Sequence, residues 1–131
     1  MSHLLDVNLL LACAWQSHAD HSKACAWLEK QKEFVTCPLT QLGFLRVSLS
    51  PGFRADFADA LAALEDIITR TGAEYVPDDL PAAKIPAVTS HADVTDAYLV
   101  ALAKAHKLKL ATLDAALCSR SWAKGVAVKP L

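Results

Sequence analysis

The sequence contains few glycines, 4 in a chain of 131 residues. Loops that hold nucleotide phosphates through backbone N–H groups depend on closely spaced glycines, and the chain has no Gly-x-x-x-x-Gly-Lys-Ser/Thr motif. It also has no Gly-x-Ser-x-Gly motif, and no Cys, His and Asp residues whose spacing supports a protein nucleophile. These absences argue against a phosphate-loop nucleotide-binding protein and against covalent catalysis.

An excess of charge of one sign is also missing, because the formal net charge is −1 at pH 7. A charge this close to zero excludes nucleic-acid binding through a broad basic surface, but it permits a local basic patch or bound metal ions. Long apolar runs are missing as well. The longest, from Leu9 to Trp15, is too short to cross a bilayer, and Asp6 interrupts the apolar stretch that a signal peptide needs. We therefore expect no membrane segment.

The four cysteines lie among apolar neighbours at spacings that match no zinc-binding signature. Buried free thiols in a reducing compartment explain this pattern better than a disulfide framework does, so we expect a cytoplasmic protein. The length of 131 residues and the hydrophobic fraction of 53% predict a single domain that spans residues 1–131. The cysteines are Cys13, Cys25, Cys37 and Cys118.

Short apolar segments alternate with helical patterns along the chain. Residues 94–106 are apolar almost all round, which predicts a helix buried against a sheet. Such alternation is typical of a parallel sheet covered by helices on both faces, so the sequence predicts an α/β fold with three α/β/α layers and a central parallel sheet. Strands are expected at residues 3–5, 34–37, 73–76, 108–112 and 126–128, and helices at residues 7–15, 21–32, 38–50, 53–70, 94–106 and after Asp114, with an irregular loop over residues 77–91.

Aspartates interrupt the apolar pattern where strands end. Asp6 lies in the run His-Leu-Leu-Asp-Val-Asn-Leu-Leu-Leu-Ala-Cys-Ala-Trp, which otherwise has the composition of a buried core. Burying an ionised carboxylate costs several kcal/mol unless it is paired, hydrogen-bonded or bound to metal. Asp114 follows the strand 108–112, and Asp96 lies in the first turn of the helix 94–106. Because ligand sites in parallel sheets form at the carboxyl ends of the strands, we expect the three aspartates to converge there.

Two interpretations of these aspartates are open. Each one alone could be a helix N-cap, or a first-turn acid that complements the helix dipole. Three acids at one edge would repel one another, and a divalent metal ion relieves both that repulsion and the cost of burial. Oxygen ligands without histidine or cysteine suit Mg²⁺ or Mn²⁺. Such ions lower the pKa of bound water, hold a phosphate and stabilise a departing oxyanion, which is what phosphodiester hydrolysis needs.

Four stretches resemble, in order and spacing, the motifs of PIN-domain proteins, and above all those of VapC-type toxins of bacterial toxin–antitoxin pairs. The resemblance covers essentially the whole chain. It implies a PIN-like fold, a Mg²⁺- or Mn²⁺-dependent endoribonuclease that cuts RNA, a homodimer, and a cognate VapB-like antitoxin that inserts a segment over the active site. The stretches are residues 5–11 (Leu-Asp-Val-Asn-Leu-Leu-Leu), 40–47 (Thr-Gln-Leu-Gly-Phe-Leu-Arg-Val), 95–99 (Thr-Asp-Ala-Tyr-Leu) and 111–114 (Ala-Thr-Leu-Asp).

The resemblance also implies roles for individual residues. Asp6, Asp96 and Asp114 match the catalytic carboxylates that bind metal. The strand ends single out Asp6 and Asp114 independently, and Asp96 can join them if its helix starts at that edge of the sheet. Asn8 and Thr112 match the polar residues beside the carboxylates, where they would meet the RNA substrate. The resemblance therefore implies a metal-binding set of three acids with two polar neighbours.

One position departs from the family pattern. Gln41 stands where many relatives carry a catalytic glutamate, and its amide oxygen could hold a metal or its water but brings no negative charge. We therefore expect weaker binding of a second metal ion, and stronger binding in a Gln41→Glu variant. Arg46, in the same stretch, could contact a substrate phosphate or could be a surface cation near a helix C-terminus.

Two other functions stay open. A degenerate PIN-type module that binds RNA or protein without cleavage would account for Gln41. A receiver-like signalling domain with an acidic phospho-acceptor pocket ranks last, because the chain lacks the expected late-strand lysine beside the acids. Among the neighbouring residues, Asp93 is interpreted as the N-cap of the helix 94–106, and His18 and His21 as solvent-facing residues at the start of a helix.

Overall fold

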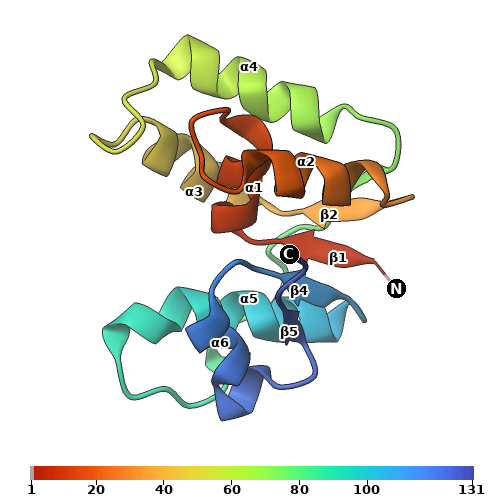
Figure 1. Ribbon diagram of the computed structural model, residues 1–131. Helices are drawn as coiled ribbons and strands as arrows, with labels where there is room; N and C mark the ends of the chain where they lie inside the picture. Colours follow the sequence, from red (N-terminus) through yellow and green to blue (C-terminus); the bar gives the residue numbers. More distant parts are fainter. Residues whose placement is uncertain (1) are drawn as a thin grey trace.

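The computed structural model describes residues 2–131 and contains a parallel sheet of five strands (Figure 1). The strands lie in the order β3-β2-β1-β4-β5, and every neighbouring pair is parallel. Of the single domain predicted over residues 1–131, Met1 lies outside the described residues. The strands are β1 (His3–Leu5), β2 (Phe34–Thr36), β3 (Ala73–Tyr75), β4 (Lys109–Ala111) and β5 (Ala127–Val128).

Helices cover both faces of the sheet, which confirms the predicted three-layer α/β/α fold (Figure 1). One layer holds α1 (Val7–Ala14), α2 (His21–Glu29), α3 (Pro38–Ser48) and α4 (Phe57–Ile68), and the other holds α5 (Val94–Ala105) and α6 (Ala115–Ser119). Short 3-10 turns form η1 (Ala82–Lys84), η2 (His91–Asp93) and η3 (Ser121–Ala123). None of the helices within residues 2–131 is long and apolar enough to span a membrane.

The direction in which strands are added to the sheet reverses between β1 and β4. From β1 the chain passes through β2 to β3 at one edge, and it then returns through α5 to β4, which pairs with the other side of β1. In open α/β sheets a crevice forms outside the carboxyl ends of the strands where the strand order reverses. Residues that follow β1 and β4 therefore border the same crevice.

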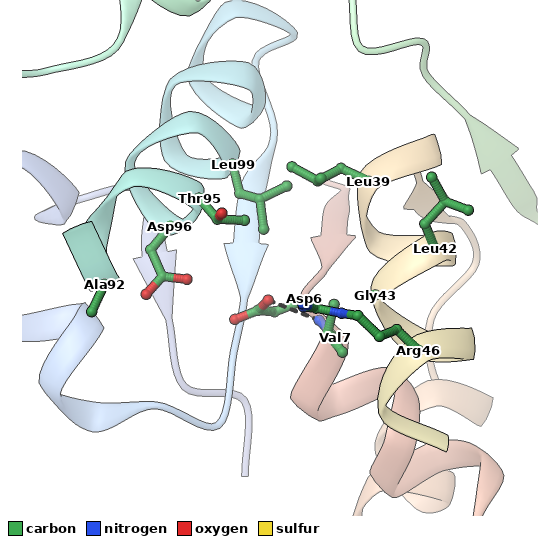
Figure 2. A pocket seen from close by; sticks show the side chains of 10 residues that line it. All are labelled: Asp6, Val7, Leu39, Leu42, Gly43, Arg46, Ala92, Thr95, Asp96 and Leu99. Carbon is green, nitrogen blue, oxygen red and sulfur yellow. Dashed lines mark hydrogen bonds between the residues drawn. The ribbon is translucent and has the colours of Figure 1, made fainter. Parts of the chain in front are cut away.

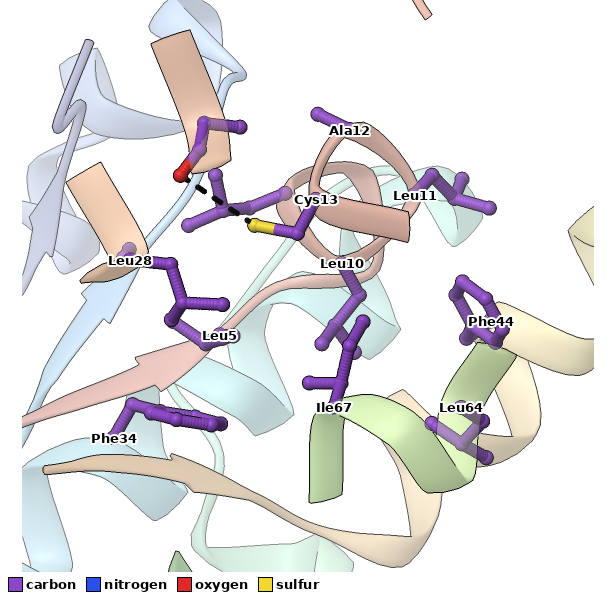
Figure 3. Close-up of a cluster of buried hydrophobic side chains, with 13 residues drawn as sticks. Leu5, Leu10, Leu11, Ala12, Cys13, Leu28, Phe34, Phe44, Leu64 and Ile67 are labelled. Atoms are coloured by element: carbon purple, nitrogen blue, oxygen red, sulfur yellow. Dashed lines mark hydrogen bonds between the residues drawn. The ribbon is translucent and has the colours of Figure 1, made fainter. Parts of the chain in front are cut away.

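The sheet is buried on both faces. Successive strand residues point to opposite sides, so Leu5 and Ala111 join the core under α1 to α4, whereas Leu4 and Leu110 join the core under α5 and α6. Figure 3 shows the first core, where side chains of α1, α3 and α4 pack over Leu5 and Phe34. Burial on both faces explains why the inner strands β1, β2 and β4 are mostly apolar rather than alternating, whereas β3 at the edge exposes Glu74 and Tyr75.

The helix predicted over residues 53–70 is shorter in the structure, where α4 begins at Phe57. The chain turns before it, because Arg54 has a φ of 55°. Asp56 then caps the helix, its Oδ1 accepting a hydrogen bond from Asp59 N at 2.8 Å. Phe53 fits the helical spacing of the apolar residues but lies outside the helix.

The C-terminal end of α1 is capped by side chains from α2. His21 Nδ1 lies 2.8 Å from the carbonyl oxygen of Ala12, and Cys25 Sγ donates to the carbonyl oxygen of Cys13 at 3.5 Å. The last carbonyls of a helix have no partner within it, so these contacts satisfy two of them. The prediction that His21 faces solvent is wrong for this reason. The four cysteines are free, as predicted, but of the four only Cys13 and Cys37 are buried.

Gly72 joins α4 to β3 at a point where no side chain fits. Its φ is +89°, and a Cβ placed there would lie 2.1 Å from the carbonyl oxygen of Lys32. The close approach lets the Gly72 carbonyl accept a hydrogen bond from Phe34 N at 3.0 Å, at the start of β2. Glycine is thus required for both the backbone conformation and the available space.

Candidate active site

A cavity of about 690 Å³ opens beside the carboxyl end of β1 (Figure 2). Its walls are the first turn of α1, the N-terminal half of α5 and one face of α3, and the carboxylates of Asp6 and Asp96 point toward one another across it. Its position matches the crevice at the point where the strand order reverses. The lining residues are Asp6, Val7, Leu39, Leu42, Gly43, Arg46, Ala92, Thr95, Asp96 and Leu99.

Asp6 is buried at the end of β1, with 7% of its surface exposed. Its Oδ1 accepts a hydrogen bond from Val7 N at 2.8 Å, and its Oδ2 accepts one from the Thr112 hydroxyl at 2.7 Å. Burial raises the pKa of Asp6 above its ordinary value, the two hydrogen bonds oppose this shift, and the charge of Asp114 adds to it. The carboxylate is therefore held in one orientation at a site that disfavours its charge.

The Thr112 hydroxyl, just after β4, connects the polar residues around Asp6. It donates its hydrogen to Asp6 and accepts from Asn8 Nδ2 at 3.0 Å and from Asp114 N at 3.1 Å. Asn8 Oδ1 in turn accepts a hydrogen bond from Leu113 N at 3.0 Å. Asn8 and Thr112 thus fasten the turn after β4 to the first turn of α1, and Thr112 orients the buried carboxylate.

Replacing Thr112 by valine, which has a similar shape, is expected to lower the free energy of unfolding by about 1–3 kcal/mol, because the Asn8 amide and the Asp6 oxygen lose their partner. If the cavity is catalytic, activity is expected to fall by about 10–100-fold, as when the partner that orients a metal ligand is lost. Thr112→Ser keeps the hydroxyl and serves as the control. Chemical denaturation measures the first effect, and equal stability of the valine and serine variants would contradict it.

Asp96, in the first turn of α5, interacts electrostatically with several other carboxylates. Burial, followed by the charges of Asp6, Asp114 and Asp93, raises its pKa to about 6, and the positive charge of Arg120 opposes the shift. These mutual effects mean that the three predicted aspartates share one electrostatic environment. A divalent cation would relieve the repulsion among them.

The raised pKa of Asp96 predicts how stability depends on pH in the metal-free protein. The folded state holds this proton more tightly than the unfolded chain, so the free energy of unfolding should decrease as the pH rises from about 4 to 6. Asp96→Asn should therefore raise stability at pH 7.5 by about 1 kcal/mol, a value reduced for the solvent that reaches this half-buried group. Thermal unfolding of both proteins at pH 5 and 7.5 checks this. A variant no more stable than wild type at pH 7.5 would contradict it.

Asp114 lies outside the lining of the cavity and caps α6, its Oδ1 accepting a hydrogen bond from Leu117 N at 3.1 Å. Within residues 2–131, no three His, Cys, Asp or Glu side chains are close enough together to hold one metal ion. The two carboxylates that do face the cavity still fit Mg²⁺, which commonly binds one or two carboxylates and completes its coordination with water and substrate phosphate. In this structure Asp114 therefore caps a helix, while Asp6 and Asp96 are the two carboxylates that face the cavity.

The structure brings α3 to the cavity, but with a different face from the one that includes Gln41. Leu39, Leu42, Gly43 and Arg46 follow helical spacing along the wall. Gln41 lies about 200° around the helix from Leu39, and its Nε2 donates to the Thr36 hydroxyl at 3.0 Å. The four α3 residues at the cavity carry no carboxylate, and Gln41→Glu would place its charge beside β2 instead. That Gln41 acts in catalysis stays a prediction.

Gly43 and the leucines of the wall were not recognised from the sequence. A Cβ at Gly43 would lie 2.6 Å from Val7 Cγ2, so this glycine lets α3 approach the first turn of α1 that follows Asp6. The spacing of Leu39, Leu42 and Gly43 with Arg46 is a signal that could have found this face. Arg46 lines the cavity and also lies in the last turn of α3, so both interpretations of it are compatible.

Asp93 does not cap α5 with its side chain as predicted. It is the last residue of the 3-10 turn η2, with φ −90° and ψ −8°, whereas a capping residue needs an extended backbone. Ser90 caps η2 instead, its hydroxyl accepting from Ala92 N at 3.2 Å. The Asp93 carboxylate pairs with the Arg120 guanidinium at 3.4 Å.

A model of the PIN domain matches residues 3–122 of the chain. The fold and this match define the class, and the chain belongs to the PIN-domain family. The predicted resemblance to VapC-type proteins is also confirmed, because the chain is 36% identical over 119 residues to Ribonuclease VapC38 of Mycobacterium tuberculosis, covering 86% of this chain and 84% of that one.

Two solved structures share the fold. Mycobacterium tuberculosis VapC20, described as a toxin that cleaves the sarcin-ricin loop, superposes with a TM-score of 0.67 at 13% identity, covering 91% of this chain and 94% of that one. VapBC2 from Rickettsia felis, bound to a DNA fragment from its promoter, gives a TM-score of 0.66 at 12% identity and covers 98% of both chains. At these identities the two structures support the fold alone.

Proposed function

We propose that the protein is a VapC-like toxin that hydrolyses RNA phosphodiester bonds as a Mg²⁺- or Mn²⁺-dependent endoribonuclease. The proposal rests above all on one observation, the carboxylates of Asp6 and Asp96 that face one open cavity at the crevice of a PIN fold. It is supported by the similarity to a relative named as a ribonuclease. No covalent intermediate is needed, because water can be the nucleophile.

The residues around the cavity would have different roles in the reaction. When bound by Asp6 and Asp96, Mg²⁺ or Mn²⁺ supplies a water of lowered pKa and a positive charge for the departing oxygen. Thr112 and Asn8 would hold Asp6 in place, and Asp114 would add negative charge near the metal ion while its side chain caps α6. Arg46 would neutralise a phosphate of the RNA at the cavity wall.

Removal of metal tests this function directly. We expect the purified protein to cleave structured or single-stranded RNA in the presence of Mg²⁺ or Mn²⁺, and EDTA to reduce cleavage to the background of the uncatalysed reaction, because no protein nucleophile can take over. Gel analysis of end-labelled RNA measures the effect, and added Mn²⁺ should restore cleavage. RNA binding without cleavage at any metal concentration would favour a degenerate PIN-type binding module instead.

A VapB-like antitoxin and a second copy of the chain are the proposed protein partners. The first is supported by the fold shared with VapBC2 of Rickettsia felis. The second is supported by large apolar side chains that are exposed near the cavity, Leu42 at 64% and Val94 at 46%. Light scattering at micromolar concentration distinguishes a homodimer from a monomer.

A further inference from the structure

Arg120 forms an ion pair beside the cavity that the mechanism above does not use. Its Nη2 lies 3.4 Å from Asp93 Oδ1, and the side chain of Asp93 is only 16% exposed. A carboxylate that is mostly buried needs a partner, and the side chain of Asp93 makes no cap to α5. Among the described residues 2–131, the hydrogen bond between Arg120 and Asp93 is the only one between side chains that joins the segment of η2 and α5 to the segment of α6 and η3. The pair therefore connects the helix that carries Asp96 to the helix that Asp114 caps.

The backbone fixes Arg120 at this place. Its N–H donates to the carbonyl oxygen of Leu117 at 3.1 Å, and its own carbonyl accepts from Ala123 N at 3.0 Å, so the residue is anchored between α6 and η3. Asp93 precedes Asp96 by three residues, about one helical turn, and the positive charge of Arg120 also opposes the rise in the pKa of Asp96, so the guanidinium acts on both acids. Half of the Arg120 side chain is exposed, at 50%, so it can leave the pair without unfolding its surroundings.

We propose that Arg120 is a built-in counter-ion, which neutralises the acidic side of the cavity in the metal-free protein and thereby weakens the affinity of the cavity for divalent cations. The inference rests on the proposed function, since it requires that the cavity binds such a cation. A guanidinium and a divalent ion compensate the same negative charges, so the presence of one makes the electrostatic free energy of binding the other less favourable. Arg120 is a residue that acts on the metal site through Asp93 and Asp96.

Mn²⁺ binding to the whole chain tests this proposal. Isothermal titration calorimetry without RNA would compare wild type with Arg120→Gln, which removes the charge, and Arg120→Lys, which keeps it. We expect the glutamine variant to bind Mn²⁺ about threefold more tightly or better, and the lysine variant to stay near wild type. Because the effect is electrostatic, the difference in Mn²⁺ affinity between wild type and the glutamine variant should be smaller in 0.5 M KCl. Without metal, the glutamine variant should unfold at a lower temperature.

Arg70→Gln is the matched control, because Arg70 forms a similar exposed pair with Asp66 at 3.2 Å beyond the end of α4. It should leave Mn²⁺ affinity unchanged. Unchanged or weaker Mn²⁺ binding by Arg120→Gln, with wild type binding normally, would overturn the counter-ion and leave the proposed function intact. If wild type and all variants fail to bind Mn²⁺ at millimolar concentration, the metal-dependent function falls together with this inference.

Discussion

Asp6→Asn is expected to reduce RNA cleavage by at least about 100-fold while leaving the fold intact. Loss of a residue that merely orients a metal ligand costs about 10–100-fold, and Asp6 is itself the buried carboxylate at the cavity. Asparagine has nearly the same shape, and its Oδ1 can still accept from Val7 N. The Thr112 hydroxyl loses its acceptor at Oδ2, but removal of a buried negative charge relieves the repulsion with Asp114 and opposes this loss, so the protein should remain folded.

The measurement is the initial rate of cleavage of a labelled RNA at saturating Mn²⁺, with circular dichroism and thermal unfolding to verify the fold. Asp66→Asn, on the exposed surface of α4, is the control and should cleave like wild type. An Asp6→Asn variant that retains more than about a tenth of the activity would show that the cavity is not the catalytic centre.

Gly72→Ala is expected to give the largest loss of stability of any single methyl added to the chain, by about 3 kcal/mol or more. A non-glycine residue in the left-handed region costs about 1–2 kcal/mol. At Gly72 the new Cβ would also lie 2.1 Å from the carbonyl oxygen of Lys32, so the backbone between α4 and β3 must move away from β2. The hydrogen bond from Phe34 N to the Gly72 carbonyl is lost with it.

Gly125→Ala separates the cost of a left-handed backbone conformation from the cost of the steric clash. Gly125 has a φ of +79°, but a Cβ placed there meets no atom within 4 Å. This variant should show the conformational cost alone, about 1 kcal/mol. Urea denaturation of both variants measures the difference, and equal losses would mean that the clash at Lys32 is relieved without cost.

Burial and the position of strand ends and helix starts were sufficient to predict that Asp6 and Asp96 lie at one cavity. Asp6 was recognisable because a charge inside an apolar run needs compensation, and the hydrogen bonds from Thr112 and Val7 supply part of it. The position of Asp96 followed from the start of an apolar helix. The order of the strands, and with it the crevice between β1 and β4, could not be read from local patterns, because it depends on pairing between distant segments.

The residues predicted less well depend on local register. Gln41 was expected beside the proposed metal ions because of its position in a motif. Which face of α3 borders the cavity depends, however, on how Gly43 packs against Val7. Asp93 was expected to cap α5, but it lies within the 3-10 turn η2 and therefore lacks the extended backbone that a cap requires. In both cases a shift of one or two residues along a helix changes which group a side chain contacts.

The hydrogen bond from Thr112 to Asp6 joins residues that are 106 positions apart in the chain. During synthesis β1 and the helices after it emerge first, and they can begin to fold before β4 exists. The carboxylate at the end of β1 acquires its orientation only when β4 has been made and pairs beside it. Until then, a nascent chain that already contains β1 and the helices after it carries an incomplete site.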